Sequence, residues 1–313
     1  MGLGQGAGGD HLTGHTLDTA FAAYEAVRHR LPAPVHSATP PEHVTDLDAL
    51  ADRFDAFLLD AFGVLNIGET AIPGVAERIA GLRARGKQVM VVSNAAGFPH
   101  AALVEKYARL GFSFTAEQVV TSRATLLAAL GDRRGLRWGL MATRSTGLRD
   151  LEGLDLTYLE EDPAPYAEVD GFLMIGSAAW TDARQRLLEA ALQANPRPVL
   201  VGNPDIVAPR ETGFSTEPGH FAHRLADVTG IAPEFFGKPF GNIFDLAFAR
   251  LDPIPDKSRI LMVGDSLHTD ILGAQAAGIG SALVAGYGFF ASGDPRDAIE
   301  RAGIRPDYIL ERP

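Results

Sequence analysis

The sequence predicts an α/β protein: a doubly wound, Rossmann-like parallel sheet forms the core, and a second α/β domain is inserted into it. From Leu47 onward, short apolar runs alternate with amphipathic segments of helix length, a pattern typical of parallel sheets with crossover helices. The runs are apolar throughout, as expected for strands covered on both faces. The insertion is indicated by the interval between two polar strand ends, Ser93 and Lys238, which exceeds what one strand–helix unit requires.

The apolar runs define the expected strands, and the amphipathic segments between them define the expected helices. We expect strands at Phe54–Leu59, Gln88–Val92, Trp138–Met141, Gly171–Ile175, Pro198–Val201, Arg259–Val263 and Ser281–Val284. We expect helices at Val75–Ala84, His100–Leu110, Ala124–Leu130, Asp182–Ala194, Ile243–Leu251 and Asp270–Ala277. We therefore divide the chain into a flexible leader with an N-terminal helix from Thr16 (residues 1–45), a core (46–130 and 234–313) and an inserted domain (131–233).

The composition restricts the classes of function. With 28 basic and 39 acidic residues the formal net charge is −11, and no basic run is present, so we expect no nucleic-acid partner. No apolar stretch is long enough for a membrane helix, and the glycine-rich N-terminus, which contains His11 and His15, lacks the apolar core of a secretory signal. The absence of cysteine excludes disulfides and thiolate chemistry. We expect a cytoplasmic protein without membrane association.

Two polar strand ends in the first part of the chain could carry chemistry, since ligands of open parallel sheets bind beyond the carboxyl ends of the strands. Asp60 directly follows an apolar run, and its carboxylate could attack an electrophile. Gly63 allows a sharp turn whose amide hydrogens can face an anion. Ser93 and Asn94 follow the next run and could bind an oxyanion. Taken singly, each pattern also fits an ordinary turn or helix start.

Two further polar motifs lie in the last third of the chain. Lys238, between Gly237 and Pro239, supplies a point charge at the expected start of a helix. Asp265 ends an apolar run, and Asp270 lies in the first turn of the helix that follows. Two carboxylates at this spacing suit a hard cation with oxygen ligands, although Asp270 would also complement the helix dipole.

Together and in this order, the four motifs strongly resemble those of the haloacid dehalogenase-like (HAD) superfamily, mostly phosphohydrolases that use Mg²⁺ and an aspartyl-phosphate intermediate. The resemblance extends from about Phe54 to Leu310. In the insertion, the stretches GNPDIVAPRETGFSTEPGHFA and VDGFLMIGS look like parts of C2-type cap domains. This implies the class IIA branch, which contains 4-nitrophenyl phosphatases and pyridoxal phosphatases. That branch usually has Thr-Asn-Asn after the second strand, whereas this chain has Ser-Asn-Ala.

The resemblance implies a nucleophile and a metal site. Asp60 would attack phosphorus. Mg²⁺ would be bound by Asp60, by the backbone carbonyl of Phe62 and by Asp265, while Asp270 would act mostly through a bridging water or by orienting Lys238. These residues form the predicted metal site.

The resemblance also implies a site for the transferred group. Ser93 and Lys238 would bind the phosphoryl oxygens, with Asn94 and the turn at Gly63 nearby. Because phosphoryl transfer depends chiefly on positioning and charge neutralisation, these residues would carry much of the catalysis. The expected partner is a small phosphorylated metabolite.

Phe62 occupies the position where the resemblance would place a second Asp, which protonates the leaving group and later deprotonates water. Phenylalanine can do neither, and general acid–base catalysis contributes about 10²–10⁴-fold. We therefore expect weak turnover that favours good leaving groups, and we expect Phe62→Asp to raise alkyl phosphate turnover by orders of magnitude. Glu69, His100 and His268 lie near the strand ends and are candidates for a substitute acid.

Two alternatives also start from Phe62. The site could bind a phosphorylated ligand without turnover, as a sensor. The sequence DAFG is also similar to the Asp-x-Tyr-Gly of haloacid dehalogenases, which cleave carbon–halogen bonds and need no leaving-group proton. Those enzymes do not use Mg²⁺, so the retention of Asp265 and Asp270 favours phosphate.

The inserted domain carries aromatic residues that could contact a substrate, although in so small a domain such residues are more often core. They are Tyr166, Trp180, Phe214 and His220. They do not identify the substrate. The resemblance implies that a homodimer could form through the cap.

Overall fold

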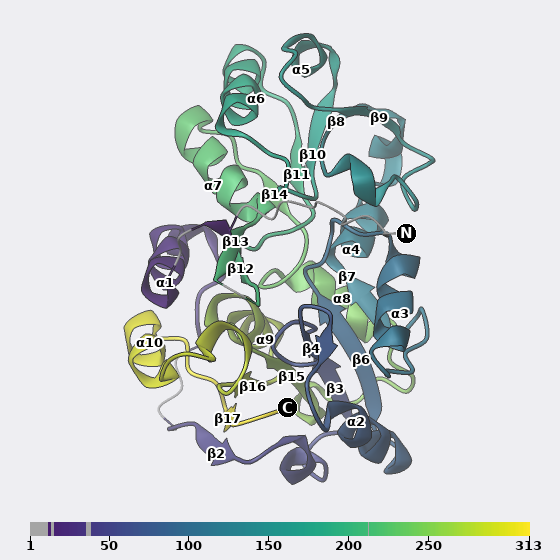
Figure 1. Ribbon diagram of the computed structural model, residues 1–313, viewed down its shortest axis with the longest axis vertical. Coiled ribbons are helices and arrows are strands. Elements are labelled where there is room, and N and C mark those ends of the chain that lie inside the picture. Colours follow the sequence, from purple (N-terminus) through teal and green to yellow (C-terminus); the bar gives the residue numbers. More distant parts are fainter. Residues whose placement is uncertain (1–11, 14–15, 36–38, 212) are drawn as a thin grey trace, which may run out of the picture.

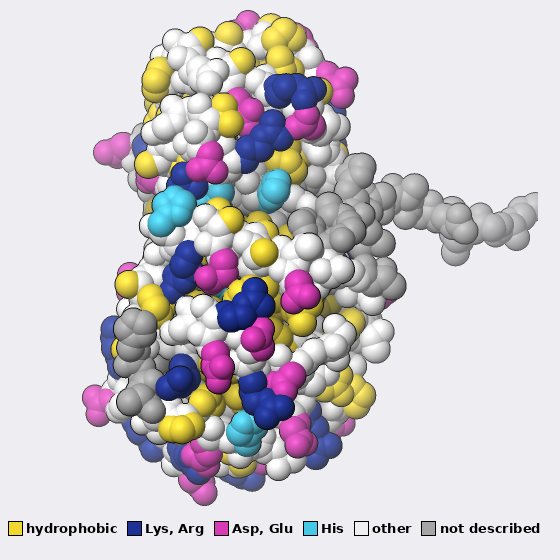
Figure 2. All heavy atoms as spheres, turned by 90° about the vertical axis from the view of Figure 1, so that its left-hand side faces the viewer, with side chains coloured by type: hydrophobic (Ala, Val, Ile, Leu, Met, Phe, Trp, Pro, Cys, Tyr) yellow, Lys and Arg dark blue, Asp and Glu magenta, His cyan; other side chains and the backbone are white. Residues whose placement is uncertain are grey.

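The computed structural model describes residues 12–13, 16–35, 39–211 and 213–313, arranged as two lobes (Figure 1). The predicted flexible leader, including His11 and His15, lies almost entirely outside the described residues. A parallel sheet lies at the centre of each lobe, so the predicted α/β class with a Rossmann-like core and a second α/β unit is confirmed. Figure 2 shows a narrower waist between the lobes, with acidic and basic side chains interspersed on that face.

The larger lobe contains a seven-stranded sheet in which all neighbouring strands are parallel. In spatial order its strands are β2 (Glu42–Val44), β17 (Tyr308–Leu310), β16 (Gly280–Val284), β15 (Ile260–Gly264), β3 (Ala56–Leu59), β6 (Gln88–Ser93) and β7 (Val119–Thr121). The strands β15, β3 and β6 are central neighbours. Their carboxyl ends therefore meet at one edge of the sheet, on the side of the smaller lobe (Figure 1).

The central strands are buried on both faces because their alternate residues feed two different hydrophobic clusters. On one face, Phe57 and Leu59 of β3 pack in a cluster with residues of α2 (Val75–Ala84) and α3 (His100–Arg109). On the other face, Leu58 packs with residues of α8 (Gly241–Phe248) and α9 (Leu272–Ala277). A fully buried β3 fixes the position of the residue at its end, Asp60.

The smaller lobe contains a five-stranded, all-parallel sheet. In spatial order its strands are β14 (Glu234–Phe235), β11 (Val199–Val201), β10 (Gly171–Met174), β8 (Arg137–Met141) and β9 (Asp155–Tyr158). One face packs against α6 (Asp182–Ala194) and α7 (Pro218–Thr229), and the other shares a cluster with α4 (Ser122–Ala129) of the larger lobe. The short helix α5 (Ala164–Glu168) precedes β10. The predicted division at residues 233/234 assigned residues 234 and 235 to the core. In the structure these residues form β14, which pairs with β11 in the second sheet.

The N-terminal helix α1 (Leu17–Ala26) connects the two lobes. It lies beside β12 (Val207–Pro209) and β13 (Phe214–Thr216) in Figure 1, and above α10 (Pro295–Ala302). Its residues Phe21 and Tyr24 share one hydrophobic cluster with residues of both lobes. The Tyr24 hydroxyl donates to the carbonyl of Val207 at 3.1 Å and accepts from the amide of Ile206 at 3.3 Å. Helix α1 therefore stabilises the position of this segment of the smaller lobe against the larger one.

The predicted elements agree closely with the observed ones where the sequence pattern is strong. The helices at Val75–Ala84 and Asp182–Ala194 have the predicted bounds. Sequence analysis missed the short or outer strands β7, β9 and β17, and also helix α7. These elements are either only a few residues long or lack a strong apolar run. Among the described residues, no helix has both the length and the apolar character needed to cross a membrane.

Candidate active site

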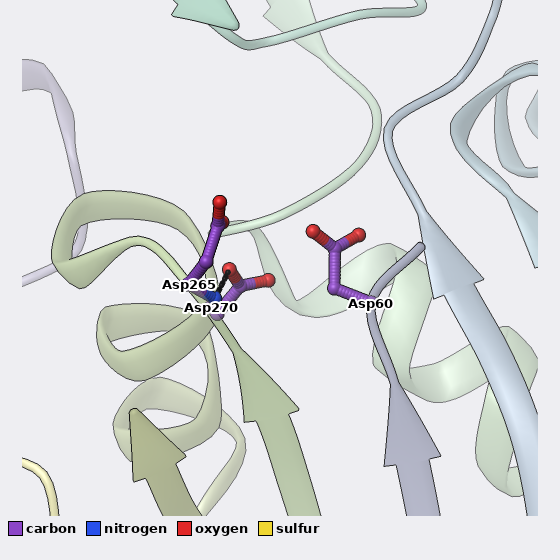
Figure 3. A group of neighbouring side chains, drawn as sticks. All are labelled: Asp60, Asp265 and Asp270. Atoms are coloured by element: carbon purple, nitrogen blue, oxygen red, sulfur yellow. Dashed lines mark hydrogen bonds between the residues drawn. The ribbon is translucent and has the colours of Figure 1, made fainter. Parts of the chain in front are cut away.

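The three central strands bring three predicted site residues together. Asp60 follows β3, Ser93 ends β6, and Asp265 follows β15. The amide of Asp60 donates to the carbonyl of Val263 at 2.9 Å, which continues the pairing of β3 with β15 beyond the last strand residue. In Figure 3, Asp265 and Asp270 lie side by side and Asp60 lies opposite them. These three carboxylates each offer an oxygen, and the oxygens lie within 4.8 Å of one another.

Lys238 reaches this group from a different direction than the sequence pattern predicts. The strand before it, β14, belongs to the smaller lobe, so Lys238 lies on the connection by which the chain returns to the larger one. Its ammonium is buried and contacts Asp60 Oδ1 at 2.7 Å and Asp270 Oδ1 at 2.6 Å. Burial lowers the pKa of Lys238, but the two carboxylates outweigh burial and raise the pKa above its ordinary value. Lys238 is therefore a permanent cation that holds two of the four motifs together.

Asp270 uses both of its oxygens inside the protein. Oδ1 accepts from Lys238, and Oδ2 accepts from the backbone amides of Asp265 and Ser266 at 3.1 Å each. The residue lies in a short π-helical turn, Leu267–Ile271, and is completely buried. These contacts fit the predicted role in orienting Lys238 better than direct binding of a metal.

The Asp265 carboxylate is buried, and one of its oxygens is bound by the backbone. Its Oδ2 accepts from the amide of Phe289 at 2.8 Å, which leaves Oδ1 for a ligand. Burial raises the pKa of Asp265 well above its ordinary value, and the nearby charges of Asp60 and Asp270 raise it further. The backbone also closes around this carboxylate: a Cβ on Gly63 would approach Oδ2 to 2.6 Å, and one on Gly288 to 1.9 Å.

The pKa of Asp60 is shifted in opposite directions by burial and by the neighbouring ammonium of Lys238. Burial raises the pKa of Asp60 from 3.8 to about 6, and the Asp270 carboxylate raises it too, while Lys238 opposes the shift. Three carboxylates face only one ammonium here. A divalent cation with oxygen ligands would offset the excess negative charge, so the residues present fit a Mg²⁺ ion.

The side-chain amide of Asn94 binds protein groups and has no free N–H. Its Oδ1 accepts from the Lys238 amide at 2.7 Å, and its Nδ2 donates to the Lys238 carbonyl at 2.9 Å and to Asp205 Oδ1 at 2.7 Å. With both side-chain N–H bonds used, only the backbone N–H of Asn94 is left as a donor for a phosphate oxygen. Ser93 lies next to it, buried, with its hydroxyl accepting from the Ala95 amide at 3.3 Å.

Asp205, which contacts Asn94, was not among the residues predicted for the site. The Asn-Pro-Asp segment was assigned to the cap by resemblance, but no role was predicted for its carboxylate. The signal was present in the sequence as an Asp flanked by Pro204 and an apolar residue. Only the fold brings it to Asn94, which lies 111 positions earlier in the chain.

The three candidates for a substitute acid are all engaged elsewhere. Glu69 is largely exposed and pairs with Lys106 at 2.7 Å. The ring of His100 bonds to the Val119 carbonyl at 2.9 Å. His268 is buried, stacks on Tyr24 and contacts Glu25 at 2.6 Å, and burial lowers its pKa. Each of these three side chains therefore has a partner outside the group of Asp60, Asp265 and Asp270. Phe62 itself is partly exposed at the turn after Asp60.

The aromatic residues of the smaller lobe are mostly core, as expected. Tyr166 and Trp180 are buried in the cluster beneath α6 and α7. Phe214 is buried in the cluster around α1, where its ring meets Phe289 edge-on at 5.3 Å between centroids. His220 is partly buried and lies edge-on to Phe221.

Comparison with known proteins identifies the class to which this fold and site belong. The profile of the haloacid dehalogenase-like hydrolases matches residues 57–151, and a second profile, HAD-hydrolase-like, matches residues 235–312. The two matches include all four motifs and leave most of the smaller lobe between them. The chain belongs to the haloacid dehalogenase-like hydrolases.

Individual relatives place the chain more narrowly. It is 26% identical over 284 residues to 4-nitrophenylphosphatase of Schizosaccharomyces pombe, which covers 83% of this chain and 92% of the relative. A possible sugar phosphatase from Cytophaga hutchinsonii superposes with a TM-score of 0.75 at 25% identity, over 87% of this chain and 98% of that one. Within its family, the chain is of the class IIA, 4-nitrophenylphosphatase type, as the motifs predicted.

A third relative was solved with a metal ion. It is a glycerol phosphate phosphatase from Mycobacterium tuberculosis in complex with magnesium, with a TM-score of 0.66 at 26% identity, over 83% of this chain and 76% of that one. The carboxylate group of Asp60, Asp265 and Asp270 could hold such an ion.

Proposed function

We propose that this protein is a Mg²⁺-dependent phosphatase that hydrolyses a small phosphorylated metabolite through an aspartyl-phosphate on Asp60. The observation that carries the proposal is the group formed by Asp60, Lys238 and Asp270, with Asp265 beside it. It combines a nucleophilic carboxylate, a fixed cation and a position for a metal. The names of the relatives, which are phosphatases of 4-nitrophenyl phosphate and glycerol phosphate, support the same reaction class.

Each residue has a distinct role in this proposal. Asp60 attacks phosphorus, and Lys238, which has one N–H bond free after contacting two carboxylates, binds a phosphoryl oxygen together with Ser93. Asp60, the carbonyl of Phe62 and Asp265 would hold Mg²⁺, which when bound neutralises the phosphoryl charge. Asp270 orients Lys238. The Asn94 side chain braces the Lys238 loop, and its backbone N–H is the donor that remains for the phosphoryl group.

The test is hydrolysis of 4-nitrophenyl phosphate, whose leaving group departs without a proton. Purified protein should release 4-nitrophenol and phosphate with Mg²⁺, lose the activity on addition of EDTA, and regain it when Mg²⁺ is restored. A panel of phosphorylated metabolites, measured in the same way, would identify the substrate class. Absence of turnover on 4-nitrophenyl phosphate and on the whole panel would contradict the proposal.

One observation favours a second candidate, a phosphate-binding sensor without turnover: Phe62 lies where an acid is expected. Such a protein would gain thermal stability with a phosphorylated metabolite but release no phosphate over hours. The same panel, measured by thermal shift and by phosphate release, distinguishes the two functions.

The backbone that encloses Asp265 provides a prediction about the metal. Gly288 has a φ of +67°, and a Cβ there would lie 1.9 Å from Asp265 Oδ2. Gly288→Ala should displace this carboxylate and weaken Mg²⁺ affinity about 10–100-fold, as loss of a supporting contact does at other metal sites. The measurement is calorimetric titration with Mg²⁺, together with activity as a function of Mg²⁺ concentration. The control is Gly81→Ala on α2, where nothing lies within 4 Å of the added Cβ. Unchanged Mg²⁺ affinity in Gly288→Ala would contradict this metal position.

A further inference from the structure

Because Phe62 cannot donate a proton, another group would have to protonate the leaving oxygen. In-line transfer requires the leaving oxygen to lie opposite the attacking oxygen of Asp60. Asp60 projects beyond the end of β3 (Figure 3), and the carboxyl ends of the core strands face the smaller lobe (Figure 1). The leaving group must therefore point toward the smaller lobe. A substitute acid can therefore lie on that lobe, opposite Asp60.

Segment 203–207 of the smaller lobe carries an acidic side chain, Asp205, that hydrogen-bonds to a residue of the four motifs. Asp205 Oδ1 accepts from Asn94 Nδ2 at 2.7 Å, and Asn94 in turn bonds both the amide and the carbonyl of Lys238. Asp205 Oδ2 has no hydrogen-bond partner in the described part of the chain. A neutral carboxyl held in this way accepts through Oδ1 and carries its proton on Oδ2, the oxygen that remains free to donate.

Contacts from several directions fix this segment. The Asp205 amide donates to Asn203 Oδ1 at 3.0 Å, and the Asp205 carbonyl accepts from the Gly219 amide at the start of α7 at 2.9 Å. The next two residues are held by the Tyr24 hydroxyl of α1. Contacts from both the smaller lobe and the N-terminal helix therefore fix the position of Asp205 beside Asn94. A proton donor needs such a fixed position within reach of the reacting group.

We propose that Asp205 is the proton carrier that replaces the acid missing at Phe62. This inference rests on the proposed phosphatase function. As an Asp60 oxygen bonds to phosphorus, the bond between phosphorus and the leaving oxygen breaks, its electron pair goes to that oxygen, and the oxygen takes the proton from Asp205 Oδ2. Water then attacks the aspartyl-phosphate at phosphorus and gives a proton to Asp205. As it does so, the bond between phosphorus and the Asp60 oxygen breaks, and its electron pair returns to the Asp60 carboxylate. The products are the alcohol and inorganic phosphate, and both carboxyl groups return to their starting states.

The electrostatic setting agrees with this role. Burial raises the pKa of Asp205 to about 7, Asn94 and Lys238 lower it, and the charges of Glu217 and Asp60 raise it. The Tyr24 hydroxyl faces it from α1, and burial raises the pKa of that hydroxyl, so Tyr24 stays neutral. Asp205 is then protonated in a large fraction of molecules at neutral pH. Alkyl phosphate turnover should fall as the pH rises through about 7, because the acid form is lost.

The experiment compares Asp205→Asn on two substrates. Asparagine keeps an oxygen for Asn94 but has no acidic proton. We expect kcat/KM for glycerol 3-phosphate, an alkyl phosphate, to fall about 10²-fold, and that for 4-nitrophenyl phosphate to change less than about threefold. The decline of alkyl turnover above pH 7 should disappear in the variant. The control is the same change at Asp155, which is exposed on β9 of the same lobe.

The outcomes separate this inference from the proposed function. Equal losses on both substrates would show a structural role, and no loss on either would show no role; both would overturn the assignment while leaving the phosphatase intact. If Asp205→Asn fails to fold, the pH dependence of the wild-type protein tests the assignment. Turnover of the alkyl phosphate should decline above pH 7, and turnover of the aryl phosphate should not. The same pH dependence for both substrates would overturn the assignment. A wild-type protein inactive on both substrates would overturn the proposed function and this assignment with it.

Discussion

Asp60→Asn is expected to abolish phosphatase activity, with a loss on the order of 10⁴-fold or more for any substrate. The amide cannot attack phosphorus to form an aspartyl-phosphate, and it is a poorer ligand for a hard cation than a carboxylate. The measurement is single-turnover and steady-state release of phosphate with Mg²⁺ at saturation. Because both leaving-group classes depend on the nucleophile, aryl and alkyl phosphates should lose activity together, unlike the selective loss expected for Asp205→Asn.

The same variant should make the metal-free protein more stable at neutral pH. Burial raises the pKa of Asp60 from 3.8 to about 6, so above pH 6 the ionised carboxylate is destabilising in the folded state relative to the unfolded one. Its removal should raise the free energy of unfolding by about 2–3 kcal/mol at pH 7, because the pKa difference of about two units, which already includes the attraction of Lys238, corresponds to about 1.4 kcal/mol per unit. A carboxyl whose folded pKa is raised contributes stability at low pH, so the advantage of the variant should decline as the pH falls from 6 toward 4.

The control for both effects is Asp245→Asn, the same change at an exposed position on α8. It should alter neither activity nor the pH dependence of stability. Residual turnover of Asp60→Asn above a few per cent would show that another group is the nucleophile. An unchanged or lower stability at pH 7 would show that Lys238 already compensates this carboxylate fully.

The sequence predicts the parts of the site that belong to the central strands. Asp60 and Asp265 follow runs that are apolar because both faces of β3 and β15 are buried. The apolar runs therefore predict the buried strands, and the ends of these strands determine where the two carboxylates lie. The fold class follows from the same runs. Two of the strands that were missed, β7 and β9, are short and lie at sheet edges, where packing leaves a weaker pattern in the sequence.

Contacts between the lobes could not be predicted from the sequence, because they join residues far apart in the chain. Lys238 was expected at the end of a core strand, and its position depends instead on the return from β14. Asn94 was expected near the phosphoryl oxygens, but that its side-chain donors bind Lys238 and Asp205 follows only from the folded structure. The role of α1 is similar: the helix itself is predicted by apolar spacing, while its contacts to Ile206 and Val207 depend on the folded arrangement.

These contacts between the lobes change what is expected of Phe62. The sequence alone predicts that Phe62→Asp raises alkyl phosphate turnover by orders of magnitude, because it assumes that no acid is present. If Asp205 already carries the proton, a second acid adds less. The gain should then be about tenfold in the wild-type background and about 10²–10³-fold in Asp205→Asn, within the range of general acid–base catalysis. Such non-additivity is the expected result when two side chains perform one step.

The double-mutant cycle measures this directly with glycerol 3-phosphate, using kcat/KM of the wild type, Phe62→Asp, Asp205→Asn and the double variant. Phe62→Asn is the matched control, since it has the size and polarity of the new side chain but cannot donate an acidic proton; it should give no gain in either background. With 4-nitrophenyl phosphate all variants should lie within a few-fold of one another, because that leaving group needs no proton. An equal gain from Phe62→Asp in both backgrounds would remove Asp205 from the mechanism. No gain in either background would show that position 62 cannot reach the leaving group.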